Sequence, residues 1–132
     1  MTTQIKGTYE ITGWEEAPYD EKKGTVKLTQ AHVTNAFKGD IEGKGTAEYL
    51  MTYPSDTSAS FIGLQRVVGT LDGRKGSFVL QATGTFENGQ AKADWFVVPE
   101  SGTGDLKGLQ GKGGYASKED GSCDIKLSYS FA

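Results

Sequence analysis

Short turn signals divide this chain at intervals of 10 to 20 residues, and this spacing constrains its fold more than any other feature. The clearest are Asp72-Gly73 and Asn88-Gly89, because Asp-Gly and Asn-Gly suit the two positive-φ positions of a tight hairpin. Weaker signals are Lys22-Lys23-Gly24, Gly39-Asp40, Pro54-Ser55-Asp56 and Asp120-Gly121. The 19 glycines and the scarcity of helix-forming runs exclude a helical bundle.

The segments between these turns predict eight strands, at about 4–14, 25–38, 43–53, 58–71, 74–87, 90–99, 109–116 and 122–131. Consecutive hairpins of this kind predict an all-β fold, an eight-stranded antiparallel up-and-down barrel. Residues 1–132 are expected to form this single β-barrel domain, since no linker or change of composition interrupts them. Two segments are expected to be connections. Residues 15–24, with Pro18, form a polar loop, and residues 101–108 form a glycine-rich crossover with one helical turn.

Hairpin geometry also predicts which side chains face the barrel interior. Two-residue turns at Asp72-Gly73 and Asn88-Gly89 place Ala82 opposite both Gly63 and Trp95. The Pro54–Asp56 loop places Glu48 opposite Gly63. Because side chains alternate between the two faces, one set is predicted to point inward. Its larger members are Leu50, Phe61, Phe78, Leu80, Phe86, Trp95 and Val97, with Tyr9, Ile11, Ile125, Leu127, Tyr129 and Phe131 from the first and last strands.

Three polar residues fall on the predicted inner face: Glu48, Gln65 and Asn35. Burial raises the pKa of a carboxyl group, so Glu48 is the candidate general acid or base. The alternatives are that Glu48 is solvated near an open end, or that the register is shifted by one residue. Gln65 and Asn35 are candidates for binding a ligand carbonyl or hydroxyl. Equally, they can satisfy backbone groups or a buried water.

Composition excludes several other classes of function. A net charge of −3 and the absence of a basic stripe argue against a nucleic-acid partner, and no apolar stretch is long enough to span a membrane. The N-terminal residues lack a signal-peptide pattern, and Cys123 is the single cysteine, so a cytoplasmic location is expected. His32 is the single histidine. No metal-ligand spacing or nucleotide-binding motif is present, and no cofactor or metal is expected.

The predicted outer face of strands two to six is unusually apolar. Tyr49, Met51, Ile62, Leu64, Val79, Phe96 and Val98 are expected there, beside His32, Arg66, Gln81 and Asp94. An apolar surface of this kind usually meets a partner, and a second copy of the chain is the simplest one. A homo-oligomer assembled through this face is therefore expected. The alternative is that the segment 15–24 covers the face, with Trp14 or Tyr19 packed against it.

Several motifs resemble a known family. The glycine-rich crossover resembles that of the allene oxide cyclase and dirigent barrels, over the stretch Ser101-Gly102-Thr103-Gly104-Asp105-Leu106-Lys107-Gly108-Leu109-Gln110-Gly111-Lys112-Gly113. The rest of the chain resembles the uncharacterised bacterial domain of unknown function 3224. The stretches that carry this resemblance are Gly39–Thr46, Glu48–Met51, Phe61–Leu71, Gly76–Gln81 and Trp95–Pro99. The resemblance implies an eight-stranded, lipocalin-like barrel, often oligomeric, and implies no activity.

The favoured function is the binding of a small, largely apolar organic molecule inside the barrel, with isomerase- or cyclase-type turnover by confinement and a buried carboxylate. Glu48 is the predicted catalytic residue, Gln65 and Asn35 orient the ligand, and Tyr9, Phe61, Trp95 and Tyr129 form the walls. One alternative is a carrier or sensor without chemistry. Another is a barrel filled by its own side chains, which acts as an assembly module.

Overall fold

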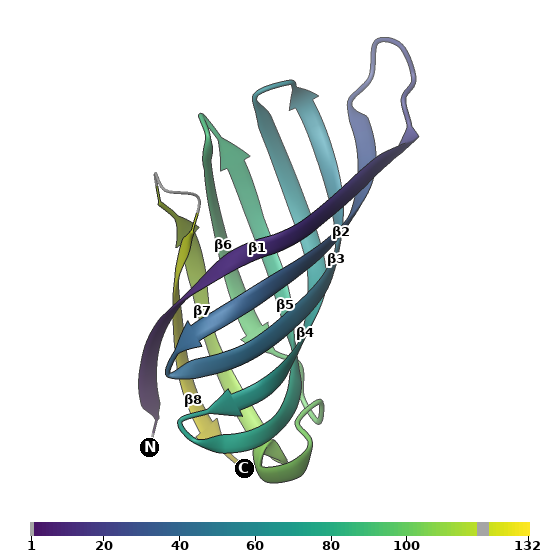
Figure 1. The fold of residues 1–132 in the computed structure, drawn as a ribbon. Helices are drawn as coiled ribbons and strands as arrows, with labels where there is room; N and C mark the ends of the chain where they lie inside the picture. The colour runs from purple at the N-terminus through teal and green to yellow at the C-terminus, as the bar shows by residue number, and fades with distance from the viewer. Residues whose placement is uncertain (1, 119–121) are drawn as a thin grey trace.

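The computed structural model describes residues 2–118 and 122–132. Within these residues, eight antiparallel strands close into one barrel in which each strand pairs with the next and β8 pairs with β1 (Figure 1). The predicted up-and-down barrel is confirmed. The strands are β1 (Thr3–Asp20), β2 (Lys27–Gly39), β3 (Ile41–Ser55), β4 (Ser58–Leu71), β5 (Arg74–Glu87), β6 (Gln90–Val97), β7 (Leu109–Ser117) and β8 (Cys123–Phe131). A 3-10 turn, η1 (Gly104–Leu106), lies between β6 and β7.

The two strongest turn signals form the hairpins that the sequence predicts. Asp72 and Asn88 have φ angles of 49° and 52°, and the glycine after each also has positive φ. Leu71 therefore pairs with Arg74, and Glu87 pairs with Gln90. The predicted register of β4, β5 and β6 follows from these turns and is confirmed throughout. The expected turn at Asp120-Gly121 lies outside the described residues.

The first strand is longer than predicted. The segment expected to be a polar loop is strand as far as Asp20, with Glu15 paired to His32 and Pro18 paired to Thr29. β1 pairs with β8 only over Thr3–Tyr9, so its second half lies at a sheet edge, where proline is tolerated. An irregularity follows Ile11, which pairs with the buried, inward-facing Asn35. Ile11 therefore points inward, as predicted, although its side chain is 46% exposed at the open end of the barrel.

The pairing of β3 with β4 differs from the prediction by one residue. Ser55 pairs with Ser58 after an irregularity, and Gly63 lies opposite Tyr49 instead of Glu48. A one-residue shift reverses the face of every side chain on a strand. Tyr49 and Met51 are buried inside the barrel, whereas Glu48 and Leu50 are exposed. The predicted directions of these four residues are therefore wrong.

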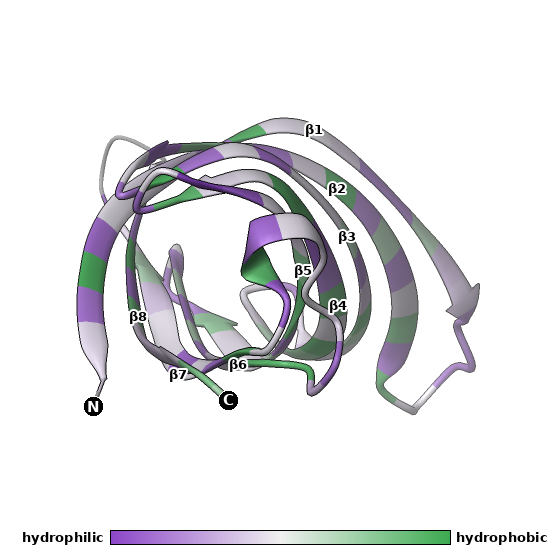
Figure 2. Ribbon diagram, turned by 90° about the horizontal axis from the view of Figure 1, so that it is seen from below, coloured by the Kyte–Doolittle hydropathy of each residue, from purple (hydrophilic) through white to green (hydrophobic). Residues whose placement is uncertain are grey.

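One end of the barrel is closed by the crossover between β6 and β7. Figure 2 shows η1 lying across this end, and the side chain of Leu106 is completely buried. The backbone N–H of Ser77 donates to Oγ1 of Thr103 at 3.0 Å, which ties the crossover to β5. The predicted crossover with one helical turn is confirmed. The best-buried core side chains include Ile41, Leu71, Phe78, Leu80, Leu106, Leu109 and Leu127.

In the part of the chain that the structure describes, no helix is long and apolar enough to cross a membrane.

Candidate functional site, an open cavity in the barrel

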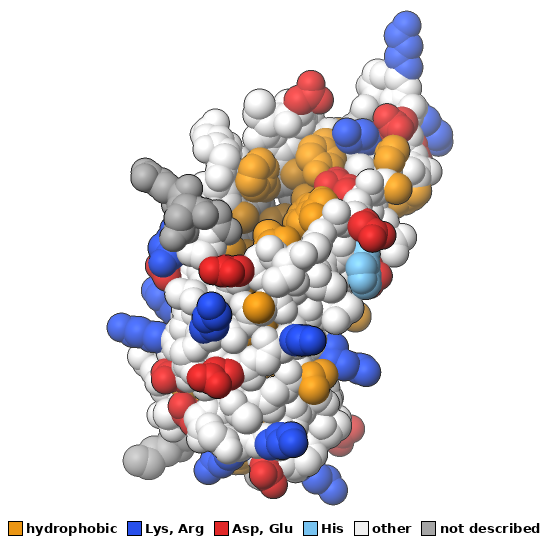
Figure 3. Space-filling view, viewed as in Figure 1, with side chains coloured by type: hydrophobic (Ala, Val, Ile, Leu, Met, Phe, Trp, Pro, Cys, Tyr) orange, Lys and Arg blue, Asp and Glu red, His pale blue; other side chains and the backbone are white. Residues whose placement is uncertain are grey.

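A cavity of about 560 Å³ lies in the half of the barrel away from η1. Figure 3 shows the opening at this end, bordered by hydrophobic and acidic side chains. The rim consists of exposed or half-buried residues, among them Ile11, Trp14, Glu16, Tyr53, Asp56 and Phe86. The inner walls are buried residues: Tyr9, Val33, Asn35, Tyr49, Met51, Phe61, Tyr115 and Cys123. The volume lies within the range of small-molecule sites in proteins.

Aromatic rings form half of the inner wall, at Tyr9, Tyr49, Phe61 and Tyr115. Tyr9 and Tyr115 have ring centroids 5.3 Å apart in a tilted arrangement. Tyr49 and Phe61 are also 5.3 Å apart and meet edge to face. These spacings are typical of favourable aromatic pairs. The rings hold one another in place and leave flat apolar faces for a ligand.

The tyrosine hydroxyls of the wall are uncharged at neutral pH. Burial raises the pKa of Tyr9, Tyr49 and Tyr115, and the neighbouring phenols add to the rise for Tyr9 and Tyr115. A phenol that keeps its proton is both a donor and an acceptor of hydrogen bonds. The inner cavity therefore presents polar groups without a formal charge.

Asn35 marks the floor of the cavity and is paired with Gln65. Nδ2 of Asn35 donates to Oε1 of Gln65 at 2.6 Å, bridging β2 and β4 across Gly45 of β3. A Cβ on Gly45 would collide with Oε1 of Gln65 and with the Phe37 ring, so glycine makes room for this pair. The two side chains are 2% and 1% exposed. Oδ1 of Asn35 and Nε2 of Gln65 have no hydrogen-bond partner, an arrangement that is costly in a dry interior.

Glu16 organises the rim. Its carboxylate accepts hydrogen bonds from Thr29 Oγ1 at 2.5 Å, Tyr53 Oη at 2.6 Å and Trp14 Nε1 at 3.0 Å. Partial burial favours the protonated form, but the three donors outweigh it and lower the pKa of Glu16. Burial and the bond to Glu16 raise the pKa of Tyr53 to about 12. Lys27 covers the Tyr53 ring at 4.8 Å. The rim thus carries an ionised carboxylate and oriented aromatic rings.

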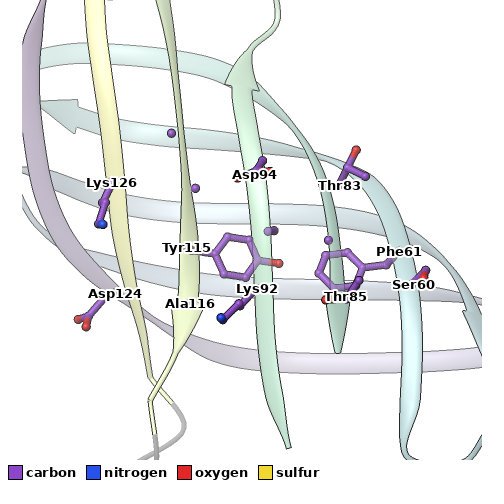
Figure 4. Close-up of a pocket in the computed structure, with 14 residues that line it drawn as sticks. Ser60, Phe61, Thr83, Thr85, Lys92, Asp94, Tyr115, Ala116, Asp124 and Lys126 are labelled. Atoms are coloured by element: carbon purple, nitrogen blue, oxygen red, sulfur yellow. The ribbon is translucent and has the colours of Figure 1, made fainter. Parts of the chain in front are cut away.

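A second hollow, of about 870 Å³, follows the barrel wall across β4 to β8 (Figure 4). Phe61 and Tyr115 border both hollows. The remaining lining is mostly exposed and of mixed charge, including Lys92, Asp94 and Lys126. The inner cavity, with its buried lining, is the better candidate for a binding site.

The structure brings together only part of the predicted site. Tyr9, Asn35 and Phe61 line the cavity. Gln65 is buried and contacts Asn35, but it is not among the lining residues. Trp95 is buried, and its indole N–H donates to the carbonyl of Lys126. Tyr129 donates to Asp72 in the β4–β5 turn. Trp95 and Tyr129 do not line the cavity, so their assignment as cavity walls is wrong.

Glu48 is on the outside of the barrel. Oε1 of Glu48 lies 2.7 Å from Nδ1 of His32, and their side chains are 53% and 47% exposed. The prediction that Glu48 faces the interior is wrong, because the irregularity in the β3–β4 hairpin shifts its strand by one position. In this orientation, Glu48 cannot act as a buried acid or base inside the barrel. His32 is exposed, as expected.

Sequence reasoning missed several residues of the cavity, among them Tyr49, Met51, Tyr115 and Glu16. Tyr49 and Met51 were predicted to face outward, and Tyr115 was not assigned to either face. Glu16 was placed in a loop. A signal for Glu16 existed, since Trp14, Glu16 and Pro18 follow one another at the two-residue spacing of one strand face. Over residues 2–118 and 122–132, no three His, Cys, Asp or Glu side chains are grouped as a metal site.

Comparison with known proteins identifies the family. A family model described as "Protein of unknown function (DUF3224)" matches residues 5–129. The chain belongs to this family. A crystal structure of a DUF3224 protein of unknown function from Shewanella oneidensis MR-1 has a TM-score of 0.81 and 29% sequence identity. The match covers 100% of this chain and 99% of the Shewanella chain. No curated protein matches. The likeness to allene oxide cyclases stays a prediction.

Proposed function

We propose that this DUF3224 protein binds a small, largely apolar organic molecule in the open half of its barrel and releases it unchanged. The observation that supports the proposal most strongly is the cavity of about 560 Å³, with its buried aromatic lining and open rim. A barrel of eight strands has room either for a packed core or for one small ligand. Here, tightly packed core side chains fill the end that η1 closes, and the other end contains the cavity.

Binding without turnover is favoured over isomerase or cyclase chemistry. That chemistry was expected to use Glu48 as an acid or base inside the barrel, and Glu48 is exposed on the outer face. The carboxylates that line the cavity are Glu16 and Asp56, both at the rim. The three donors that Glu16 engages favour its ionised form, which suits it to orient neighbours rather than to transfer protons.

Native mass spectrometry of freshly purified protein tests the proposal, with a denaturing spectrum of the same sample as reference. The expected result is a mass excess that denaturation removes, and recovery of the bound molecule chemically unchanged after incubation. Ala91 lines the cavity, so Ala91→Phe is expected to lose the bound mass. Ala36→Phe is the matched control, because Ala36 pairs with Glu10 and Lys44 and alternates with the inward-facing Asn35 and Phe37. Equal retention by both variants would contradict the proposal.

We also propose that the protein forms a homo-oligomer through the outer face of β3 to β6. Leu50 and Ile62 are adjacent there, and Leu64 and Phe96 flank Gln81. Leu50, Ile62, Leu64 and Phe96 are 50%, 48%, 52% and 41% exposed, and clustered exposed apolar side chains favour association. The proposed location of the protein is the cytoplasm, on the basis of its single cysteine.

A further inference from the structure

The floor of the cavity has an unused hydrogen-bond acceptor. Asn35 is 2% exposed and lines the cavity, and its Oδ1 has no partner in the protein. Gln65 accepts from the amide nitrogen of Asn35, whereas Oδ1 accepts from no group of the protein, so the amide oxygen is the atom that a ligand can satisfy. Buried acceptors in native proteins are nearly always satisfied. A donor from outside the chain is therefore expected at this point.

The inner cavity does not suit a charged ligand group. The charged residues among its lining are Glu16, Asp56 and Lys118, and all three belong to the rim. Lys118 is already paired with Asp124 at 3.3 Å. A carboxylate entering head first would have to lose its water without meeting a cation, which is strongly unfavourable. The leading end of the ligand must be neutral.

The shape of the inner wall favours a flat ligand. Tyr9, Tyr49, Phe61 and Tyr115 are paired at centroid distances of 5.3 Å within each pair. Aromatic rings bind other aromatic systems through offset-stacked and edge-to-face contacts. An aliphatic chain would bury the same area without these contacts.

We propose that the cavity is specific for an uncharged aromatic molecule whose leading end carries a hydroxyl or N–H group that donates to Oδ1 of Asn35. The proposal rests on the function proposed above, since it names the ligand class of the same site. It assigns Asn35 as the residue that determines specificity and Gln65 as the residue that positions it. The aromatic body lies between the wall tyrosines and Phe61, and any polar tail extends to the rim.

Three probes of similar size separate the features of this ligand class. 2-Naphthol carries a donor, 2-fluoronaphthalene has nearly the same shape but no donor, and 2-naphthoate carries a negative charge. Equilibrium dialysis measures the affinity of each. One neutral hydrogen bond to a buried acceptor corresponds to a difference of about tenfold. We expect 2-naphthol to bind about tenfold more tightly than 2-fluoronaphthalene, and 2-naphthoate more weakly than both.

Variants of the amide pair show whether Asn35 causes the preference. Asn35→Leu removes the acceptor and is expected to abolish the advantage of 2-naphthol while 2-fluoronaphthalene still binds. Because this change leaves Gln65 unpaired, the double variant Asn35→Leu/Gln65→Met provides the same test in a fold without an orphaned amide. Gln110→Met is the matched control, since Gln110 is exposed, follows the buried Leu109 and lies opposite Ser130 on the outside of the barrel.

The outcomes are distinct. If none of the three probes binds but the native spectrum shows a bound molecule, the assigned ligand class is wrong; if the probes fail and no mass is bound, the proposed function itself is overturned. If 2-fluoronaphthalene binds as tightly as 2-naphthol, or 2-naphthoate binds best, the cavity binds small molecules but the assigned ligand class is wrong. If the preference for 2-naphthol persists in the double variant, Asn35 is not the acceptor.

Discussion

Replacement of one amide of the Asn35–Gln65 pair is expected to destabilise the protein, whereas replacement of both is expected to restore most of the lost stability. Asn35→Leu removes the 2.6 Å hydrogen bond and leaves both polar atoms of Gln65 unpaired at 1% exposure. An orphaned buried polar group costs about 1–3 kcal/mol. The single variant should therefore be destabilised by this amount, and its melting temperature should fall by roughly 3–4 °C per kcal/mol for a chain of this size.

The double variant Asn35→Leu/Gln65→Met should recover most of that loss. It also removes the atoms that lack partners in the wild-type protein, Oδ1 of Asn35 and Nε2 of Gln65. Replacement of a half-satisfied polar pair by apolar groups of similar shape is close to neutral or stabilising. The cavity beside Asn35 provides space for the larger leucine. The coupling between the two substitutions should be about 1–3 kcal/mol in the stabilising direction.

Urea unfolding followed by circular dichroism measures this coupling for the wild type, both single variants and the double variant. The midpoint should shift without a change of slope, since the surface exposed on unfolding is nearly constant. If the double variant loses the sum of the two single losses, the two amides do not act as one buried pair. The inference that a ligand completes the hydrogen bonding of this pair would then lose its basis.

Three further outcomes are expected. Gly45→Ala should destabilise the barrel by about 1–3 kcal/mol, because the added methyl group collides with Gln65; an unchanged urea midpoint would show that the pair can move aside. Glu16 has a lowered pKa, so its contribution to stability is present above the pKa of the unfolded carboxyl and is lost as the pH falls through the folded pKa. Glu16→Gln should reduce this acid dependence in melting curves. It should also lower the pKa of Tyr53, which is about 12 in the wild type, toward 10 in an ultraviolet titration. If neither titration changes, the contact between Glu16 and Tyr53 at the rim is excluded. Leu64→Glu should lower the mass measured by sedimentation to that of a monomer, and a wild-type protein that is itself monomeric would refute the proposed interface.

The sequence was most informative where local chemistry decides the structure. Asp72-Gly73 and Asn88-Gly89 can form only a few turn types, so they determined the register of three strands and the inward direction of Phe61 and Ala82. The glycine-rich crossover was also predictable, since its glycines exclude a long helix. Each of these features depends on residues that are close together in the chain.

The errors lie where pairing depends on distant parts of the chain. The end of β3 contains Pro54 and an irregular pairing between Thr52 and Ser55 that the sequence does not specify. Because the predicted register of β3 was wrong by one residue, Glu48 was assigned to the interior and Tyr49 to the outer face. The second half of β1 was also missed, because its polar residues and Pro18 are typical of a loop. Its strand structure comes from pairing with β2. Both corrected segments line the cavity, β3 with Tyr49 and Met51 and β1 with Trp14 and Glu16.

Entry of an aromatic molecule into the barrel can be observed directly at Met51, one of two methionines in the sequence. Met51 is 6% exposed and lines the cavity. Its methyl signal can be followed by NMR in protein labelled with carbon-13 at the methionine methyl groups, with Met51→Leu to assign it. The account predicts that 2-naphthol shifts this signal in a saturable manner, and that Ala91→Phe prevents the shift whereas Ala36→Phe does not. A Met51 signal that stays unchanged at saturating 2-naphthol would contradict the claim that the open barrel takes up an aromatic molecule.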